Sequence, residues 1–205
     1  QAVEDFLLQR RIQNRFSDSC WLLLGRIAKQ AGQAEDAILW LEIGLRAASE
    51  SAPEALLDFS ELVLNAGDLK RIAESRRLLE QTLRRYPQMS RVVLKLAEVQ
   101  LVALDVPCLL LTGEPGSGSG VRIRGKLEIL PHLDSAEFEA AIRSSGHVLS
   151  RSGYTSLMDY AALGIRPWLV PTPGMPEQEY LARRLKAEGI APCQEQRNLS
   201  VKKFL

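Results

Sequence analysis

The chain has 205 residues, of which 46% are hydrophobic and 25% charged, and its formal net charge is +1 at pH 7. This composition is typical of a globular protein of one or two domains, and the near-neutral charge argues against a basic nucleic-acid-binding protein. No apolar run approaches the roughly 18 residues of a membrane span, and the N-terminal residues lack the layout of a signal peptide. We therefore expect a cytoplasmic protein with no nucleic-acid partner and no membrane span.

The metal-binding residue types are few and scattered. Cys20, Cys108 and Cys193 are single and far apart in the sequence, which is typical of buried thiols rather than of a disulfide framework or a metal site. Neither of the two histidines stands near a second ligand type at zinc-binding spacing. The sequence therefore predicts no metal site and no cofactor.

Residues 1–105 are predicted to be helical throughout, because apolar residues recur at helical spacing between short polar breaks. The expected helices span about 2–13, 20–31, 34–48, 53–66, 69–86 and 90–104. Consecutive helices joined by such short breaks indicate an antiparallel helical array.

The first helical pair carries small and aromatic residues at distinctive positions. Trp21, Leu24 and Gly25, followed by Gly32, resemble the W-x-x-L-G…G pattern of the tetratricopeptide repeat, in which small residues let paired helices approach closely. A weaker copy follows, and its turn glycine, Gly67, stands 35 residues after Gly32, against about 34 in that repeat family. The resemblance implies repeats that could hold a peptide or protein partner, although scattered basic residues such as Arg76, Arg77, Arg84 and Arg85 more often form a solvated face.

A third repeat begins at Ser90 and supplies only one helix. Because such repeats bury their apolar faces against neighbours and about three are needed for stability, this helix must either cap the stack or lean on the second half of the chain. We place the boundary between the two predicted domains, 1–105 and 106–205, after this helix.

The junction VPCLLLTGEPGSGSG begins like a phosphate-binding P-loop. A P-loop requires Lys followed by Ser or Thr after its last glycine, and it must open a helix. Ser119 and Gly120 occupy those places, and a strand-like stretch follows. We therefore interpret residues 116–120 as a flexible Gly/Ser connector, which would mark a natural shortening, an engineered deletion or the joining of two protein pieces.

The second half alternates short apolar runs with amphipathic stretches. Residues 121–130, 147–149 and 165–171 are expected to be strands, and residues 154–163 and 176–188 helices. Asp134 with Glu137 predicts a capping box at the start of another helix. Strand–helix units in succession favour a parallel sheet whose loops meet at one edge, where α/β proteins bind ligands. The predicted fold class is thus a helical repeat array followed by a shortened Rossmann-like parallel sheet.

The polar residues at this edge suit a nucleotide-sugar. Ser152 and Gly153 precede a helix whose first amides could hold a diphosphate. Asp159 lies on the same helix face, where a carboxylate can accept hydrogen bonds from ribose hydroxyls. Glu177 and Gln178 begin the next helix. The alternative is that Ser152 only caps its helix, that Asp159 is a solvated surface charge, and that Glu177 is a first-turn acid that complements the helix dipole.

The segments SRSGYTSLMDYAALG and LVPTPGMPEQEYLA, with ILPHLDSAEFEAAI upstream, resemble the C-terminal, nucleotide-sugar-binding half of glycosyltransferase family 28, which has the GT-B fold. The resemblance covers roughly residues 106–205. It implies a UDP-sugar ligand, with these contacts for individual residues: the phosphate turn at Ser152, Gly153 and Ser156, the ribose acid at Asp159, a sugar contact at Gln178, and the nucleobase beside His132 and Leu133.

Three positions depart from the family pattern. The ribose acid is usually Glu and is Asp159 here, Arg166 replaces a usual proline, and Glu179 replaces the second of two paired amides. In the family, the acceptor site and the catalytic base come from a separate N-terminal α/β half with no counterpart in these 205 residues. We therefore expect a UDP-sugar-binding module with no catalytic residue of its own. The alternative is a protein-interaction scaffold with an inactive α/β half, including the case of an engineered fusion.

Overall fold

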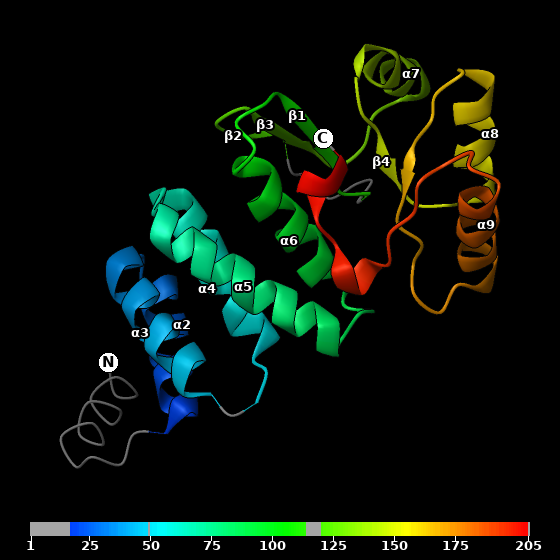
Figure 1. The fold of residues 1–205 in the computed structure, drawn as a ribbon. Helices are drawn as coiled ribbons and strands as arrows, with labels where there is room; N and C mark the ends of the chain where they lie inside the picture. Colours follow the sequence, from blue (N-terminus) through cyan, green and yellow to red (C-terminus); the bar gives the residue numbers. More distant parts are fainter. Residues whose placement is uncertain (1–16, 49, 114–119, 205) are drawn as a thin grey trace. The chain divides into compact units, whose positions relative to one another are not determined.

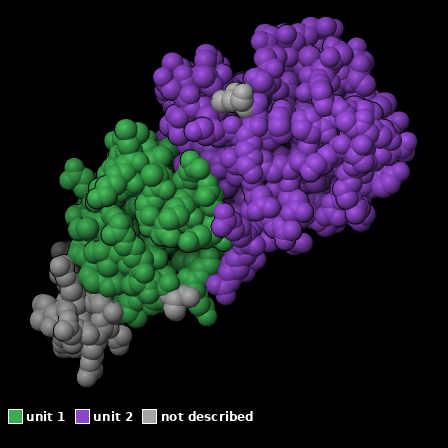
Figure 2. Space-filling model, in the orientation of Figure 1, with its two compact units in different colours: residues 1–82 green, residues 83–205 purple. Residues whose placement is uncertain are grey.

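The computed structural model of the chain describes residues 17–48, 50–113 and 120–204. The chain divides into two compact units, residues 1–82 and 83–205 (Figure 2). The helix predicted at 2–13 and the connector predicted at 116–120, except Gly120, lie outside the described residues. The division after Thr82 differs from the predicted boundary at 105, because the helix that begins at Ser90 is grouped with the second unit.

The first unit is helical in its described part. Its helices are α2 (Asp18–Gln30), α3 (Ala34–Ala47), α4 (Pro53–Ala66) and α5 (Leu69–Arg85), the last of which continues past Thr82 (Figure 1). Gly32 and Gly67 stand at the two predicted breaks with φ of 76° and 68°, a left-handed conformation that glycine adopts at little cost. The helix predictions for this region are confirmed to within three residues at each end.

Two glycines let α2 and α3 pack closely. A Cβ atom on Gly25 of α2 would lie 2.5 Å from Leu41 Cγ and 2.9 Å from the Leu41 backbone nitrogen. On Gly44 of α3, it would lie 2.6 Å from Leu22 Cδ2 and 2.9 Å from the Leu22 nitrogen. Because the backbone itself is in the way, larger residues require the two helices to move apart.

Hydroxyl groups occupy the equivalent contact between α4 and α5. Ser60 and Ser75 are both fully buried. Ser75 Oγ donates to Ser60 Oγ at 2.7 Å, and Ser60 Oγ donates to the Leu56 carbonyl at 2.6 Å. Each buried hydroxyl therefore has a partner, as buried polar groups require. Small residues at both helix contacts explain why four amphipathic helices pack as close pairs.

The second unit begins with α6 (Ser90–Val102), which packs against the end of the chain. The tail forms two 3₁₀ turns, η1 (Gln196–Asn198) and η2 (Val201–Phe204). The buried amide of Gln100 donates to the Leu199 carbonyl at 3.0 Å and accepts from the Val201 amide at 2.7 Å. The helix of the third repeat was expected either to cap the stack or to lean on the second half of the chain. The structure shows contact with the second half.

We expect Gln100→Met to destabilise the second unit by about 2 kcal/mol, because it leaves the Leu199 carbonyl and the Val201 amide buried without a partner. Methionine has nearly the same volume as glutamine, so the loss reports the hydrogen bonds rather than a cavity. Urea unfolding followed by Trp168 fluorescence measures it, in a background where Trp21 and Trp40 are replaced by Phe. A change below about 0.5 kcal/mol would mean that water replaces the amide.

The strands of the second unit form two small sheets. In the first sheet, β3 (Leu127–Leu130) lies between β1 (Cys108–Leu111), which is parallel to it, and β2 (Arg122–Arg124), which is antiparallel. In the second, β4 (Leu149–Ser150) and β5 (Trp168–Leu169) are parallel. The expectation of one parallel sheet is therefore wrong: there are two sheets among the described residues, and one of them is mixed. Residues 121–130 are a hairpin rather than one strand, because Gly125 turns the chain at a φ of 59°.

Three charged side chains pack between α6 and β2. Glu98 is 3% exposed and lies 2.7 Å from Lys95 Nζ and 2.6 Å from Arg124 Nε. The Lys95 contact is a hydrogen bond, whereas the Arg124 contact is a charge contact without hydrogen-bond geometry. We call these residues the α6–β2 ion cluster. It fixes the hairpin to α6 through a carboxylate that is almost completely removed from solvent.

Three more helices belong to the second unit. They are α7 (Ser135–Ser144), α8 (Tyr154–Ala162) and α9 (Pro176–Ala187). Leu157 of α8 and Leu185 of α9 pack on the core around Leu169, Ala182 and Ala191, and Figure 1 shows both helices on the same side of β4. The capping box predicted at α7 is confirmed: Asp134 accepts from the Glu137 amide at 2.8 Å, and Glu137 accepts from the Asp134 amide at 3.1 Å.

Candidate functional site

The candidate site is the edge of the second sheet at which β4 and β5 end. Ser150 and Leu169 are paired at the ends of these two parallel strands, so the turns that follow them leave the sheet at the same edge, as in other α/β units. The turn after β4 runs from Arg151 to Gly153 into α8, and the loop after β5 runs from Val170 to Met175 into α9. The sequence predicted both.

The start of α8 has no side-chain cap. Gly153 is the N-cap residue, and no side chain accepts a hydrogen bond from the first-turn amides. The backbone amides of Tyr154, Thr155 and Ser156 have no backbone acceptor among the described residues. Unpaired amides and the positive end of the helix dipole favour an anion at this position.

Ser152 ties the two turns together. Its side chain is fully buried, and its hydroxyl donates to the Gln178 carbonyl at 2.7 Å. The hydroxyl therefore neither caps α8, as the structural alternative had it, nor faces outward toward a phosphate. Its contribution is to hold the α8 turn against the first turn of α9.

The first turn of α9 organises the loop before it. Gln178 Oε1 accepts from the Thr172 amide at 3.0 Å, and Glu179 Oε1 accepts from the Gly174 amide at 2.9 Å. Gln178 is half-buried, and with its oxygen engaged, its Nε2 group is the part of the amide left to donate. Glu177, by contrast, is exposed. Gln178 is thus oriented as a donor, whereas Glu177 is not fixed by any hydrogen bond or ion pair within the described part.

Ser156 and Asp159 lie on neighbouring turns of one face of α8, since they are three residues apart. Ser156 is half-buried and Asp159 is exposed. Next to them, Tyr160 is 4% exposed and donates to Ser150 Oγ at 2.8 Å. Burial raises the pKa of Tyr160, and the nearby Asp159 charge raises it further, against the opposing effect of the Ser150 hydrogen bond. Tyr160 therefore stays protonated and anchors α8 to β4.

His132 and Leu133 do not belong to either of the two turns at this edge. They follow β3, which belongs to the other sheet, and they precede α7. His132 is exposed and Leu133 half-buried. Among the hydrogen bonds of the described residues, none joins either residue to the turn at Arg151–Gly153 or to the loop before α9. The predicted nucleobase contact thus stays a prediction.

Sequence analysis missed a guanidinium at the same edge. Arg151 Nη1 donates to the Val170 carbonyl at 3.0 Å and also to Gln196 Oε1. No carboxylate forms an ion pair with Arg151 in the described part of the chain, and burial lowers the pKa of its guanidinium. Arginine remains charged in spite of this. The signal in the sequence was a basic residue directly after a buried strand, but nothing linked it to Gln196, 45 residues later.

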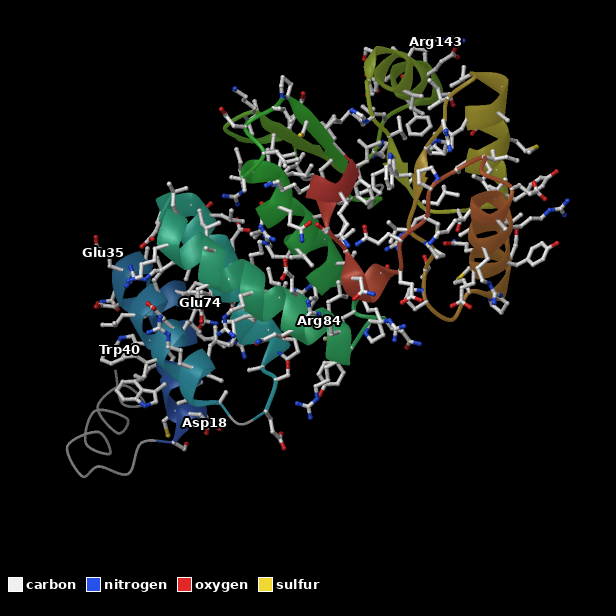
Figure 3. The ribbon with its side chains drawn as sticks, in the orientation of Figure 1. Asp18, Glu35, Trp40, Glu74, Arg84 and Arg143 are labelled. Carbon is white, nitrogen blue, oxygen red and sulfur yellow. The ribbon has the colours of Figure 1, made fainter. Side chains whose placement is uncertain are left out.

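The first unit contains a charged groove of about 330 Å³ between α3 and α5. It is lined by Glu42, Arg46, Lys70, Arg71, Ala73, Glu74 and Arg77. Arg71 Nε donates to Glu42 Oε2 at 2.8 Å, and this hydrogen bond raises the pKa of Arg71. Arg77 forms an ion pair with Glu74, which Figure 3 labels on α5. Three of its four basic side chains are thus paired with acids inside the chain.

The described residues contain no group of three or more metal-ligating side chains that could hold an ion. None of the described helices is long and apolar enough to cross a membrane. No protein-family model, curated protein or solved structure matches the chain. The functional interpretation therefore depends on the chemistry of the β4–β5 edge and on the resemblance noted in the sequence.

Proposed function

We propose that the second unit binds a nucleoside-diphosphate sugar of the UDP class at the β4–β5 edge. One observation carries the proposal: Arg151, which has no carboxylate partner in the described part of the chain, stands in the turn that leads into the uncapped start of α8, three residues before Tyr154. Both features favour an anion at the same turn. The resemblance of residues 106–205 to glycosyltransferase family 28, with its GT-B fold, supports a diphosphate as that anion.

The remaining contacts follow from the two helices that begin at this edge. Asp159, exposed on α8, would accept hydrogen bonds from the ribose hydroxyls. Gln178 Nε2, left to donate because Oε1 accepts from Thr172, would contact the sugar. The proposal covers donor binding only, because no described side chain at this edge forms a nucleophile–base pair that could carry out transfer.

A protein-interaction role for the first unit is the second candidate. The groove between α3 and α5, in an array of paired helices that resembles tetratricopeptide repeats, supports it. Because all three of its arginines already have carboxylate partners, a peptide would have to compete with these internal ion pairs. This competition makes donor binding by the second unit the stronger proposal.

We expect UDP to raise the melting temperature of the chain, because a ligand that binds only the folded state stabilises it by RT ln(1 + [L]/Kd), or about 2.7 kcal/mol at a concentration of 100 Kd. Asp159→Ala should weaken UDP binding by at least about tenfold, since a charge-assisted hydrogen bond contributes about 1.5–3 kcal/mol. Calorimetric titration measures the affinity of the wild type and of Asp159→Ala for UDP. His132→Ala should have a smaller effect if only the backbone at that position contacts the base.

Glu139→Ala is the matched control, because Glu139 is also an exposed acid on a helix of the second unit. It should bind UDP like the wild type. Equal affinity in Asp159→Ala, with an unchanged melting temperature in the absence of ligand, would remove the ribose assignment. If millimolar UDP and other nucleoside diphosphates leave the melting temperature unmoved, the donor-binding proposal is wrong and the interaction role becomes the better candidate.

A further inference from the structure

Gln196 lies where three distant segments of the second unit meet. It is 3% exposed, on η1 in the C-terminal tail. Its Oε1 atom accepts from Arg151 Nη1, and its Nε2 group donates to the Pro87 carbonyl. One side-chain amide therefore joins the turn after β4, the segment before α6 and the tail.

A side-chain amide fits both neighbours of Gln196. The guanidinium of Arg151 can only donate, and the Pro87 carbonyl can only accept, so the buried side chain between them must offer one acceptor and one donor. A carboxylate would satisfy Arg151 and face the Pro87 oxygen without a proton, and an apolar side chain would satisfy neither. This complementarity also fixes which end of the Gln196 amide faces Arg151.

The contact leaves the positive charge of Arg151 in place. A neutral amide and the Val170 carbonyl orient the guanidinium, but they do not neutralise it as a carboxylate would. Burying a cation without a counter-charge costs free energy, and a position that served packing alone would be satisfied by an apolar residue or an ion pair. Arg151 belongs to the turn that leads into the uncapped start of α8, two residues before the N-cap Gly153, and an anion bound at this turn would supply the missing charge.

We infer that Gln196 is a positioning residue that holds Arg151, still charged, at the anion-binding turn, so that the C-terminal tail sets the affinity for the phosphate part of the ligand. The inference rests on the proposed donor site for its ligand. It also makes a claim about the free protein, namely that the order of the turn depends on Gln196. The two parts are tested separately.

The first test measures the turn without ligand. Hydrogen–deuterium exchange at the amides of Leu157 and Val170, which donate to the Gly153 and Ser150 carbonyls on either side of the turn, should be at least tenfold faster in Gln196→Ala than in the wild type, because Arg151 loses one of the two contacts that fix it. Gln194→Ala is the matched control: the side chain of Gln194 donates to the Asn198 carbonyl within the same tail and to no residue of the turn among those described, so exchange should stay unchanged. Unchanged exchange in a folded Gln196→Ala would overturn the positioning role, whether or not UDP binds.

The second test separates charge from order. Gln196→Glu keeps an acceptor for Arg151 but pairs its charge with a carboxylate, so the affinity for UDP should fall by at least fivefold, while that for uncharged uridine stays within twofold. Equal losses for both ligands would mean that the site has been distorted, and no loss for UDP would mean that the Arg151 charge is not used; either result would overturn the charge role. If the wild type does not bind UDP, the donor site is refuted. The exchange experiment would still decide the positioning role.

Arg151→Lys provides a check that does not depend on the folding of either Gln196 variant. Lysine keeps the positive charge but is shorter than arginine and lacks the guanidinium whose Nη1 donates to both the Val170 carbonyl and Gln196. Exchange at the Leu157 and Val170 amides should therefore rise, and UDP affinity should fall less than in Arg151→Met. Equal affinity in Arg151→Lys and Arg151→Met would contradict a role for the charge.

Discussion

Glu98→Gln should destabilise the second unit by about 3–5 kcal/mol, the largest effect that we expect from a single substitution. The change preserves the shape of the side chain but removes the negative charge that lies between Lys95 and Arg124. Both cations have side chains that are only 13% exposed. Removing one partner of a buried ion pair is costly because the remaining charge cannot regain its hydration.

Urea unfolding measures this loss, and Glu128→Gln is the matched control, because Glu128 is an exposed glutamate on β3 of the same sheet. The control should change stability by less than about 0.5 kcal/mol. Combining Glu98→Gln with Lys95→Met should cost less than the sum of the two single changes, because Lys95 and Glu98 interact directly in the wild type. Strict additivity would contradict the ion cluster as the origin of the effect.

The helices of the chain could be predicted from the sequence because their signals are local. Gly32, Gly67 and Pro53 stop or start helices by their own backbone preferences. The capping box of Asp134 and Glu137 needs only four consecutive residues. Each of these features acts within one turn of a helix, so a single sequence is enough to locate it.

The sheet was harder to predict because strand pairing is not local. The run from Val121 to Leu130 looked continuous, and Gly125 gave the only sign of the hairpin that the structure contains. Whether the strands form one parallel sheet or two separate sheets depends on contacts between segments far apart in the sequence. Periodicity alone does not show that β1 pairs with β3, because it marks strands but not their partners.

The candidate site shows the same division. The sequence located the turns after β4 and β5, but for Ser152 it offered only a place in the phosphate turn or a hydroxyl that caps α8. In the structure, that hydroxyl donates to the Gln178 carbonyl, 26 residues away. Arg151 and Gln196 were missed for the same reason, since their roles arise from contacts with Val170 and Pro87 that no local pattern encodes.

The close packing of α2 on α3 makes Gly25→Val the second large expected effect. Valine adds three carbon atoms where even the first, Cβ, would lie 2.5 Å from Leu41 Cγ and 2.9 Å from the Leu41 nitrogen. Overpacking typically costs about 1–3 kcal/mol, and contact with backbone rather than with a flexible side-chain end places this site at the upper end. We therefore expect a loss of about 3 kcal/mol in the first unit.

Gly25→Ala tests the balance between packing and helix propensity. Alanine favours a helix over glycine by about 1 kcal/mol, so a helix with free space at this position would become more stable. Because its Cβ has no free space at Gly25, we expect a net loss, whereas Ala73→Val on the exposed face of α5 should cost less than about 1 kcal/mol. Urea unfolding followed by Trp21 and Trp40 fluorescence reports on this unit, since the two rings stack with centroids 5.1 Å apart on α2 and α3. A gain in stability for Gly25→Ala would show that the two helices can separate at little cost, and it would remove the packing reason for a glycine at this position.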